Sequence, residues 1–385
     1  MGEARLLTST LIVLSVGHFA VDFYSSSVAT LQPALAERYG LSLTQAGLIG
    51  GAFMLGSAVT QLFFGLISDR VHSRLFTVMG LLVAAVFFSI MGLAPGFNTL
   101  LLLILLGGMG VAAFHPQSTA QAVTGVGRRR GLALSIFLTS GMMGVSLGPA
   151  YFSYLVERLG FESLYWAAAP ALPVAAFLLW RLPPMRDKVQ AKPPVDWSVF
   201  RKHGKTLSLH YSLVVLRSIV QLALGQFLTL YLYIERGFSL KEASLGLMLF
   251  FVGSAISAGI GGTLADRIGG KPVVLISMIS CVPFLALFLG ADGWLSFAGL
   301  FIGSLLLLMT NPVIVLMAQD LIPSQAGTAS ALMMGFGWGM AGITFIPFIG
   351  WLSDRIGLET VLWGVILLPL LGFMMALKLP RTAHG

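Results

Sequence analysis

Long apolar segments separated by short polar ones dominate this chain. Twelve of them approach or exceed the roughly 20 residues that an α-helix needs to cross a lipid bilayer, and the alternating pattern of a membrane β-barrel is absent. The expected helices span 7–36, 43–67, 75–94, 98–124, 130–156, 162–182, 206–235, 240–265, 272–291, 294–318, 326–352 and 359–379. We therefore predict an all-α integral membrane protein, and we expect the first segment to remain as an uncleaved helix.

The charged ends of these segments repeat at a constant interval. Asp69 and Arg70 return as Asp266 and Arg267, which lie 197 residues further along the chain. Such a repeat in a membrane protein indicates two pseudo-symmetric halves, an architecture typical of proteins with a pathway between the halves.

Three further correspondences support this duplication. Glu157-Arg158 matches Asp354-Arg355 at the same interval, while His115-Pro116 matches Asn311-Pro312 after 196 residues, as does Gly131 with Gly327. We expect an N-terminal six-helix bundle over 1–182, a cytoplasmic linker over 183–205 and a C-terminal six-helix bundle over 206–385. The linker is rich in proline and charge, and we expect a short surface helix within it near 197–200.

The composition agrees with the bilayer as solvent. Hydrophobic residues make up 57% of the chain, charged residues 10%, and the mean hydropathy is +0.90, which leaves too little polar surface for a soluble globule. Most Lys and Arg residues fall in loops on one side, so both termini are expected in the cytoplasm of a multi-pass inner-membrane protein. This bias also explains the net charge of +8 without a nucleic-acid partner.

Several classes of protein are disfavoured by what the sequence lacks. A single cysteine, Cys281, excludes an intramolecular disulfide. No nucleotide-binding glycine-rich loop with its lysine, metal-binding cysteine cluster or paired catalytic constellation is evident. We therefore expect neither an enzyme nor a cofactor, and we expect a monomer whose partners are the lipid bilayer, a small-molecule substrate and protons.

Two motifs resemble those of the major facilitator superfamily, and the resemblance covers the whole chain. Segment 65–74 (GLISDRVHSR) is similar to the superfamily's signature between helices two and three, and it is repeated in 262–271. Segment 141–149 (GMMGVSLGP) resembles its antiporter-associated glycine/proline motif. The resemblance implies gating roles for Gly65, Asp69, Arg70, Arg74, Gly262, Asp266 and Arg267, and a helix-packing hinge at Gly141, Gly144, Gly148 and Pro149.

A more particular resemblance is to the fosmidomycin-resistance-type branch of efflux carriers. Segments 17–22 (GHFAVD), 114–118 (FHPQS) and 131–137 (GLALSIF) carry it. Members of that branch tend to have Phe-His-Pro-Glu in the fourth helix, whereas Gln117 stands here in place of the glutamate. This departure removes a carboxylate from any proton step that would use it. The resemblance implies a small-molecule exporter and leaves the substrate open.

His18 and Asp22 are the strongest candidates for coupling transport to protons. They are four residues apart in the first helix and therefore share one face, where the carboxylate can orient the imidazole. Ionisable groups are costly in a membrane helix and mark function there. We predict that Asp22 carries the proton. The alternative is a buried hydrogen-bonded pair that only stabilises packing.

Candidate substrate-binding residues lie in three other helices. His115, protonated, could bind an anionic group, or it could instead bond the carbonyl that Pro116 frees. Arg217, far from either end of the seventh helix, has Gln221 one turn further on and could pair with Asp22, bind the charge of a substrate or extend to the interface. The remaining candidates are Gln117 and Tyr231 of the same two helices, Asn311 of the tenth helix and Tyr24 of the first, with Gln32 and Trp338 as further possibilities.

The sequence thus favours a secondary active transporter that exports a small amphiphilic or anionic compound by proton antiport and alternating access. Alternatives are an ion-coupled importer of an organic anion and a transition-metal exporter that uses His18, Asp22 and His115 as ligands. In the preferred interpretation no residue is assigned as a metal ligand. An integral-membrane enzyme or sensor is the alternative from another class.

Overall fold

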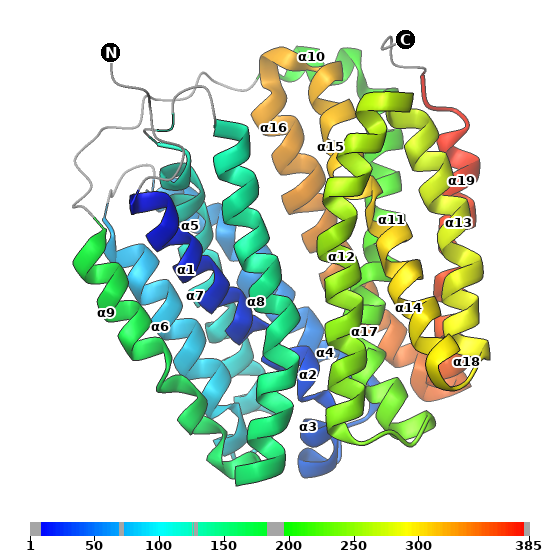
Figure 1. The fold of residues 1–385 in the computed structure, drawn as a ribbon. Helices are drawn as coiled ribbons and strands as arrows, with labels where there is room; N and C mark the ends of the chain where they lie inside the picture. Colours follow the sequence, from blue (N-terminus) through cyan, green and yellow to red (C-terminus); the bar gives the residue numbers. More distant parts are fainter. Residues whose placement is uncertain (1–8, 69–72, 125, 127–129, 183–195, 381–385) are drawn as a thin grey trace. The chain divides into compact units, whose positions relative to one another are not determined.

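The computed structural model describes residues 9–68, 73–124, 126, 130–182 and 196–380, and these form helices joined by short turns (Figure 1). Within these described residues, twelve helices are long and apolar enough to cross a membrane. The most apolar window of each is between 28% and 72% buried inside the protein, so much of every helix faces outward. The predicted twelve-helix, all-α fold is confirmed, and the short helix expected near 197–200 is α10, Trp197–Lys202.

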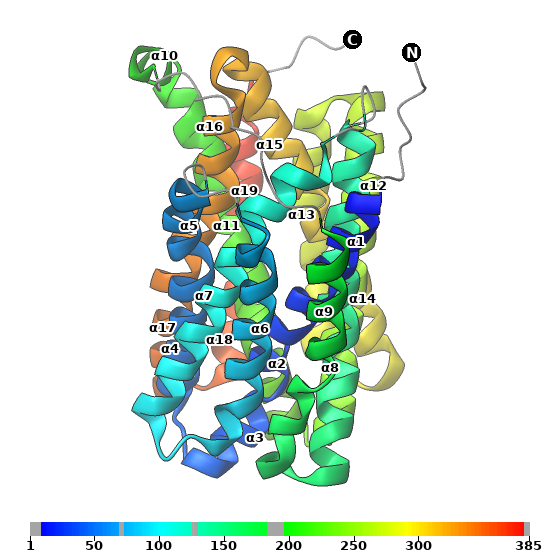
Figure 2. The same ribbon diagram turned by 90° about the vertical axis from the view of Figure 1, so that its left-hand side faces the viewer.

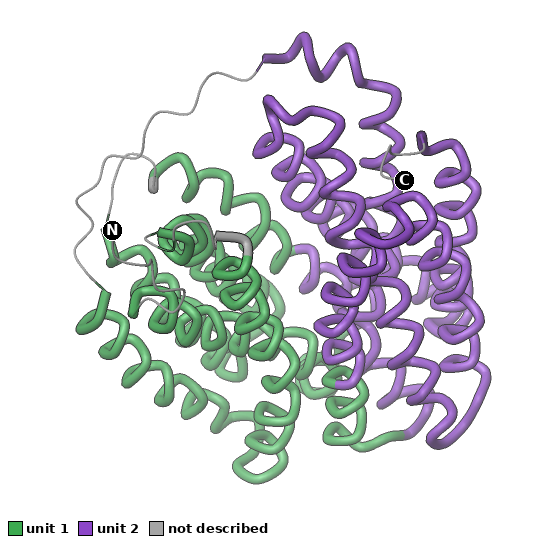
Figure 3. Tube along the Cα trace, turned by 45° about the horizontal axis from the view of Figure 1, so that its top comes forward, with its two compact units in different colours: residues 1–41, 52–190, 238–248 green, residues 42–51, 191–237, 249–385 purple. Residues whose placement is uncertain are grey.

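The chain forms two compact units, which are distinguished in Figure 3. Unit 1 comprises 1–41, 52–190 and 238–248. Its helices are α1 Ser9–Ser25, α2 Ser27–Thr30, α3 Gln32–Tyr39, the end of α4 Leu43–Met54, η1 Leu55–Val59, α5 Thr60–Ser68, α6 Leu75–Ser89, η2 Ile90–Leu93, α7 Phe97–Ala122, α8 Arg130–Leu159, η4 Phe161–Ala168, α9 Ala171–Arg181 and the start of α12 Leu240–Ile268.

Unit 2 comprises 42–51, 191–237 and 249–385. Besides most of α4 and of α12 it contains α10, α11 Gly204–Leu230, η5 Tyr231–Glu235, α13 Gly270–Gly290, α14 Gly293–Leu308, α15 Thr310–Leu321, η6 Pro323–Gln325, α16 Ala326–Ser330, η7 Ala331–Gly337, α17 Trp338–Ile356, α18 Leu358–Ile366 and α19 Leu368–Ala376. The first turns of α4 and α12 each belong to the unit that holds the helices of the other half of the sequence, and the boundaries 1–182, 183–205 and 206–385 stay predictions.

Carboxylates near the ends of α8 and α17 bind the first turns of α12 and α4, which we call the exchanged helix starts. In unit 2, Asp354 accepts hydrogen bonds from the backbone amides of Leu43 and Thr44, both at 2.8 Å, and from the Thr44 hydroxyl. In unit 1, Glu157 accepts one from the amide of Lys241 at 3.0 Å. A carboxylate satisfies the unpaired amides at a helix start and interacts favourably with the helix dipole.

The sequence repeat reappears as repeated contacts. Arg74, before α6, donates to the carbonyl of Leu182 at 2.7 Å, and Lys271, in α13, donates to that of Leu379 at 2.6 Å. Both members of the second pair lie 197 residues after those of the first. In each unit a basic side chain thus holds the end of the last helix of its half.

Large apolar side chains point away from the protein interior. Phe63 is 61% exposed, and Trp180 and Trp294 are each 75% exposed. Exposed apolar surface on this scale is unfavourable in water and favourable in lipid. It fits the expected bilayer environment.

Within unit 1, α1 packs most extensively against α8 and also contacts α6, α7 and α9. Figure 2 shows α9 beside α6 and α1. Two glycines of α8 allow the close approach to α1: a Cβ atom at Gly144 would lie 2.1 Å from the Phe19 carbonyl oxygen, and one at Gly148 would lie 2.0 Å from the Ser26 hydroxyl. The glycine face of the 141–149 motif therefore packs on α1 inside its own unit, and its role as a hinge stays a prediction.

Candidate functional site

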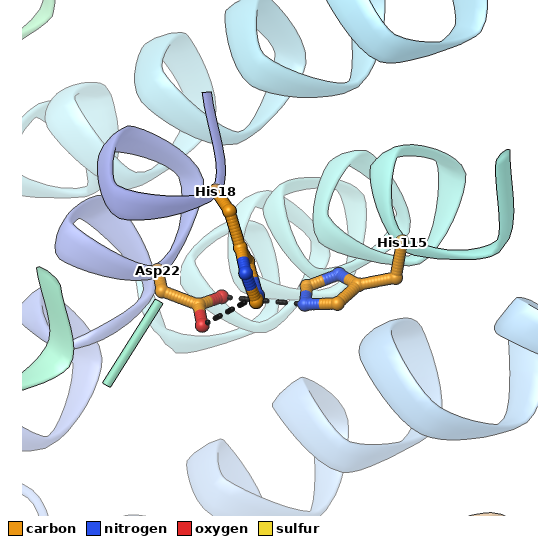
Figure 4. A group of neighbouring side chains, drawn as sticks. All are labelled: His18, Asp22 and His115. Atoms are coloured by element: carbon orange, nitrogen blue, oxygen red, sulfur yellow. Dashed lines mark ion pairs between the residues drawn. The ribbon is translucent and has the colours of Figure 1, made fainter. Parts of the chain in front are cut away.

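Three ionisable side chains of unit 1 converge on one point between α1 and α7 (Figure 4). Nε2 of His18 lies 3.2 Å from Oδ2 of Asp22, and Nε2 of His115 lies 3.5 Å from Oδ1. The predicted i,i+4 pair of the first helix is thus joined by the histidine of the fourth membrane helix. We call His18, Asp22 and His115 the His-Asp-His cluster.

The backbone holds both imidazoles by their other nitrogen. Nδ1 of His18 lies 2.7 Å from the carbonyl oxygen of Phe137 in α8, and Nδ1 of His115 lies 2.8 Å from that of Val111, one turn back in α7. Because a carbonyl can only accept, each Nδ1 carries the hydrogen, and each Nε2 is directed at the carboxylate. Pro116 removes the amide that would bond the Ala112 carbonyl, so His115 does not bond the freed carbonyl but its neighbour.

Aromatic rings fix the position of His18. Its imidazole stacks on Phe137, with ring centroids 4.1 Å apart, and on Phe114, with centroids 6.1 Å apart. The His18 side chain is 3% exposed, whereas Asp22 is 16% and His115 is 20% exposed. The His-Asp-His cluster is therefore anchored in the interior at His18 and accessible at its Asp22 and His115 side.

Gly141 of α8 forms the wall against the charged atoms. A Cβ atom at this position would lie 2.5 Å from both Oδ2 of Asp22 and Nε2 of His18. Only a residue without a side chain leaves that space open. Sequence reasoning noted Gly141 as a packing residue and missed its position at the His-Asp-His cluster.

In unit 2 the central charged group is Arg217 of α11. Its guanidinium, 3% exposed, donates to the Gln221 side-chain oxygen and, at 3.0 Å, to the Ser218 hydroxyl. Both partners are neutral, and among the described residues its Nε has no hydrogen-bond partner. Arg217 and Gln221 do share a face, as expected. The pairing of Arg217 with Asp22 would join the two units and stays a prediction.

The other substrate-binding candidates are dispersed. The Tyr24 hydroxyl donates to the carbonyl of Ala167 at 2.7 Å, a contact between α1 and η4, and the Tyr231 hydroxyl accepts from Arg236, five residues further along the chain, at 3.3 Å. Gln117 is buried in α7. Asn311 is half-buried at the start of α15, where the tenth membrane helix is interrupted next to Pro312.

The predicted gating residues are only partly described. Asp69 and Arg70 lie outside the described residues, and Gly65 lies in α5, where an added Cβ would meet nothing within 4 Å. Arg74 bonds the end of the sixth membrane helix, as stated above. Gly262, Asp266 and Arg267 end α12; both charged side chains are exposed, and neither forms an ion pair with another described residue.

Sequence reasoning missed the acceptors that organise these contacts. The Phe137 carbonyl that orients His18 carries no sequence signal, since every residue has a carbonyl. The amides bound by Asp354 and Glu157 did carry a sequence signal. Both acids recur at the interval of the repeat, and so do the helix starts that follow Ser42 and Ser239.

Comparison with known proteins places the chain in a family. The family model described as Major Facilitator Superfamily matches residues 14–344. The fosmidomycin resistance protein of Escherichia coli (strain K12) is 30% identical to this chain, with 99% of this chain and 95% of that protein covered. The multidrug resistance protein MdtG of Escherichia coli (strain K12 / DH10B) is 29% identical over 71% of this chain and 70% of its own length.

Solved structures share the fold at low sequence identity. A bacterial homolog of the human lysosomal transporter Spinster, in an inward-facing and unoccupied conformation, superposes with a TM-score of 0.80 at 16% identity and full coverage of both chains. A D-xylose-proton symporter gives a TM-score of 0.75 at 16% identity, covering 97% of this chain and 98% of its own. With the family match, the resemblance noted in the sequence is confirmed: the chain belongs to the major facilitator superfamily and is a multi-pass membrane transporter, not an enzyme.

Proposed function

We propose that this transporter exports a small amphiphilic or anionic compound from the cell in exchange for protons, by alternating access. It acts as a monomer in the inner membrane with both termini in the cytoplasm. The relatives named for fosmidomycin resistance and multidrug resistance support export. The bias of Lys and Arg toward one set of loops supports the orientation.

The observation that carries proton coupling is the His-Asp-His cluster. A carboxylate and two imidazoles within a membrane helix bundle are costly to maintain, and such groups mark proton and ion pathways. Both Nδ1 atoms are occupied by backbone carbonyls, so protons exchange at the carboxylate and the two Nε2 atoms that face it. Asp22 is the proton carrier in this proposal, and His18 orients it.

Antiport requires that the proton and the substrate favour opposite states of the transporter. A proton taken up between the Asp22 carboxylate and the Nε2 atoms that face it changes the contacts between α1 and α7 at His18, Asp22 and His115. It therefore favours a different packing of these helices. The substrate favours the other state through contacts that include Arg217, Gln221 and Asn311.

The motif residues at the cytoplasmic helix ends then act as gates. We place Asp69, Arg70 and Arg74 of the first half and Asp266 and Arg267 of the second in this role. Arginine binds carboxylates and carbonyls with directional hydrogen bonds, as Arg74 does at Leu182. These contacts close one side of the pathway and break when the other side closes.

A second candidate function follows from the position of His115. An anionic group that binds this imidazole competes with the Asp22 carboxylate, which lies 3.5 Å from Nε2. A proton on the displaced Asp22 carboxylate offsets the negative charge that the anion adds, so the anion and a proton would bind together. That order of binding gives symport, and it supports an importer of an organic anion.

One experiment separates the two candidates. The purified chain is reconstituted in proteoliposomes that contain a trapped pH-sensitive dye, and fosmidomycin is added outside with no imposed gradient. Antiport makes the lumen more alkaline as the compound enters, and symport makes it more acidic. Protein-free liposomes give the passive rate. Compound entry with no protein-dependent pH change in either direction contradicts proton coupling.

A further inference from the structure

The His-Asp-His cluster presents three metal-ligand atoms to one point. One ring nitrogen of His18, one carboxylate oxygen of Asp22 and one ring nitrogen of His115 all lie within 4.8 Å of one another. A tetrahedral zinc ion with bonds of about 2.0–2.1 Å separates its ligand atoms by roughly 3.3–3.4 Å. Nε2 of His18 lies 3.2 Å from Oδ2 of Asp22 and Nε2 of His115 lies 3.5 Å from Oδ1, and both separations are close to this spacing.

The hydrogen bonds behind the rings prepare both imidazoles for a metal. A histidine that binds a metal through one ring nitrogen typically donates the N–H of its other ring nitrogen to a carbonyl or carboxylate. That hydrogen bond orients the ring and leaves the first nitrogen free to coordinate. His18 does so to Phe137 and His115 to Val111. When each imidazole is neutral, its Nε2 lone pair faces a carboxylate oxygen, an arrangement that a cation between them stabilises.

The space for an ion is kept by Gly141. A Cβ atom there would lie 2.5 Å from both Oδ2 of Asp22 and Nε2 of His18, close to where a bound ion would contact the same two atoms. The glycine also leaves the accessible side at Asp22 and His115 open for a further ligand. Three protein ligands with an open fourth position is the arrangement of zinc sites that exchange a ligand.

The donor set selects the class of ion. Two imidazole nitrogens and one carboxylate oxygen suit Zn²⁺, Co²⁺ and Ni²⁺, whereas Mg²⁺ and Ca²⁺ require sets of oxygen ligands. We propose that His18, Asp22 and His115 form a binding site for one divalent transition-metal ion of the Zn²⁺ class. The proposal stands on the geometry of these residues and not on the exported compound or on proton coupling.

Cobalt is the probe, because Co²⁺ occupies zinc sites and reports its coordination in the visible spectrum. The full-length chain in detergent is stripped with a chelator and titrated with Co²⁺, and Zn²⁺ is then added as competitor. We expect one Co²⁺ per chain with the intense bands of low coordination number, abolished by Zn²⁺. His18→Ala and His115→Ala should each weaken Co²⁺ binding at least about 10-fold, since losing even a group that only hydrogen-bonds a metal ligand typically costs that much affinity.

Gly141→Ala is the sharper variant, because it removes no ligand and places a methyl group in the ion's space. We expect it to reduce Co²⁺ affinity as strongly as loss of a histidine. Gly225→Ala is the matched control, since a Cβ there meets nothing within 4 Å. His210→Ala controls for histidine loss: His210 is buried and bonds the i−4 carbonyl of Thr206 as His115 bonds Val111, yet no ion pair of the described residues includes it.

Asp22→Asn keeps the shape of the side chain and weakens binding if the carboxylate is a ligand, which protects the test against variants that fail to fold. Unchanged Co²⁺ affinity in both Gly141→Ala and His115→Ala, or no coordination bands in the unaltered chain, overturns the proposal. Proton-driven transport by a chain that binds no Co²⁺ would contradict the proposed metal site and leave the proposed proton coupling standing. Metal binding with transport that ignores the pH gradient would contradict the proposed coupling alone.

Discussion

The carboxylate of Asp22 lies 3.2 Å from Nε2 of His18, one turn away on the same helix, and the ring of His18 is held from behind by the Phe137 carbonyl at 2.7 Å. The imidazole cannot turn away without losing that bond and its stacking on Phe137. Any change in the charge of Asp22 therefore acts on α7 through His115 and on α8 through His18.

Asp22→Asn should abolish transport driven by a pH gradient while retaining exchange. The amide has nearly the shape of the carboxylate, but it takes up no proton in the physiological range. Uptake in proteoliposomes with an imposed gradient should fall to the rate without a gradient. Exchange of labelled for unlabelled compound, which needs no net proton movement, should persist. Normal gradient-driven accumulation by this variant contradicts the role of Asp22.

Arg217→Lys should impair transport nearly as much as Arg217→Ala. The guanidinium binds Gln221 and Ser218 with separate nitrogens, a geometry that an ammonium does not reproduce. A double-mutant cycle with Gln221→Ala should give a coupling of about 0.5–3 kcal/mol in substrate affinity, as expected for residues in contact. If Arg217 binds the substrate's charge, the KM of an anionic compound should rise far more than that of a neutral one. Equal losses for both compounds would assign Arg217 to packing.

Gly144→Ala should lower the stability of unit 1. The added methyl group would lie 2.1 Å from the Phe19 carbonyl oxygen, which belongs to the backbone of α1 and cannot turn aside. Overpacking of this kind typically costs about 1–3 kcal/mol, and the melting temperature in detergent should fall. Gly225→Ala, in open space, should leave it unchanged or slightly raise it, because alanine favours the helix by roughly 0.5–1 kcal/mol. Equal melting temperatures for the two variants would contradict the close approach of α8 to α1.

The two carboxylates that cap exchanged helix starts should differ in their contribution. Asp354 accepts from two amides and a hydroxyl, and Glu157 accepts from one amide. Loss of a cap costs roughly 0.5–2 kcal/mol, so Asp354→Ala should lower the melting temperature more than Glu157→Ala. Asp320→Ala, the control, removes an exposed acid for which no hydrogen bond or ion pair with a described residue is found. A larger effect of Glu157→Ala would reverse the expected order.

The sequence predicted contacts wherever position along one helix decides them. His18 and Asp22 share a face because they are one turn apart, and Arg217 reaches Gln221 for the same reason. Between helices the structure shows what the repeat alone did not specify: Arg74 and Lys271, 197 residues apart, bond carbonyls that are also 197 residues apart. Tyr24 shows the limit: its hydroxyl donates to the carbonyl of Ala167, and nothing near Tyr24 in the sequence indicates whether a hydroxyl faces a pathway or the backbone of another helix.

The sequence by itself indicated that the surrounding solvent is a lipid bilayer, how many helices cross it and that the chain is duplicated. Hydropathy over about 20 residues and the constant interval between repeated motifs can be read without knowledge of packing. Only the tertiary structure decided that His115 of α7 joins the pair on α1, that Gly141 leaves room beside them, and that Asp354 caps the start of α4. Each of these depends on which faces of separate helices meet. That choice depends on close packing along the whole length of both helices, which no single residue encodes.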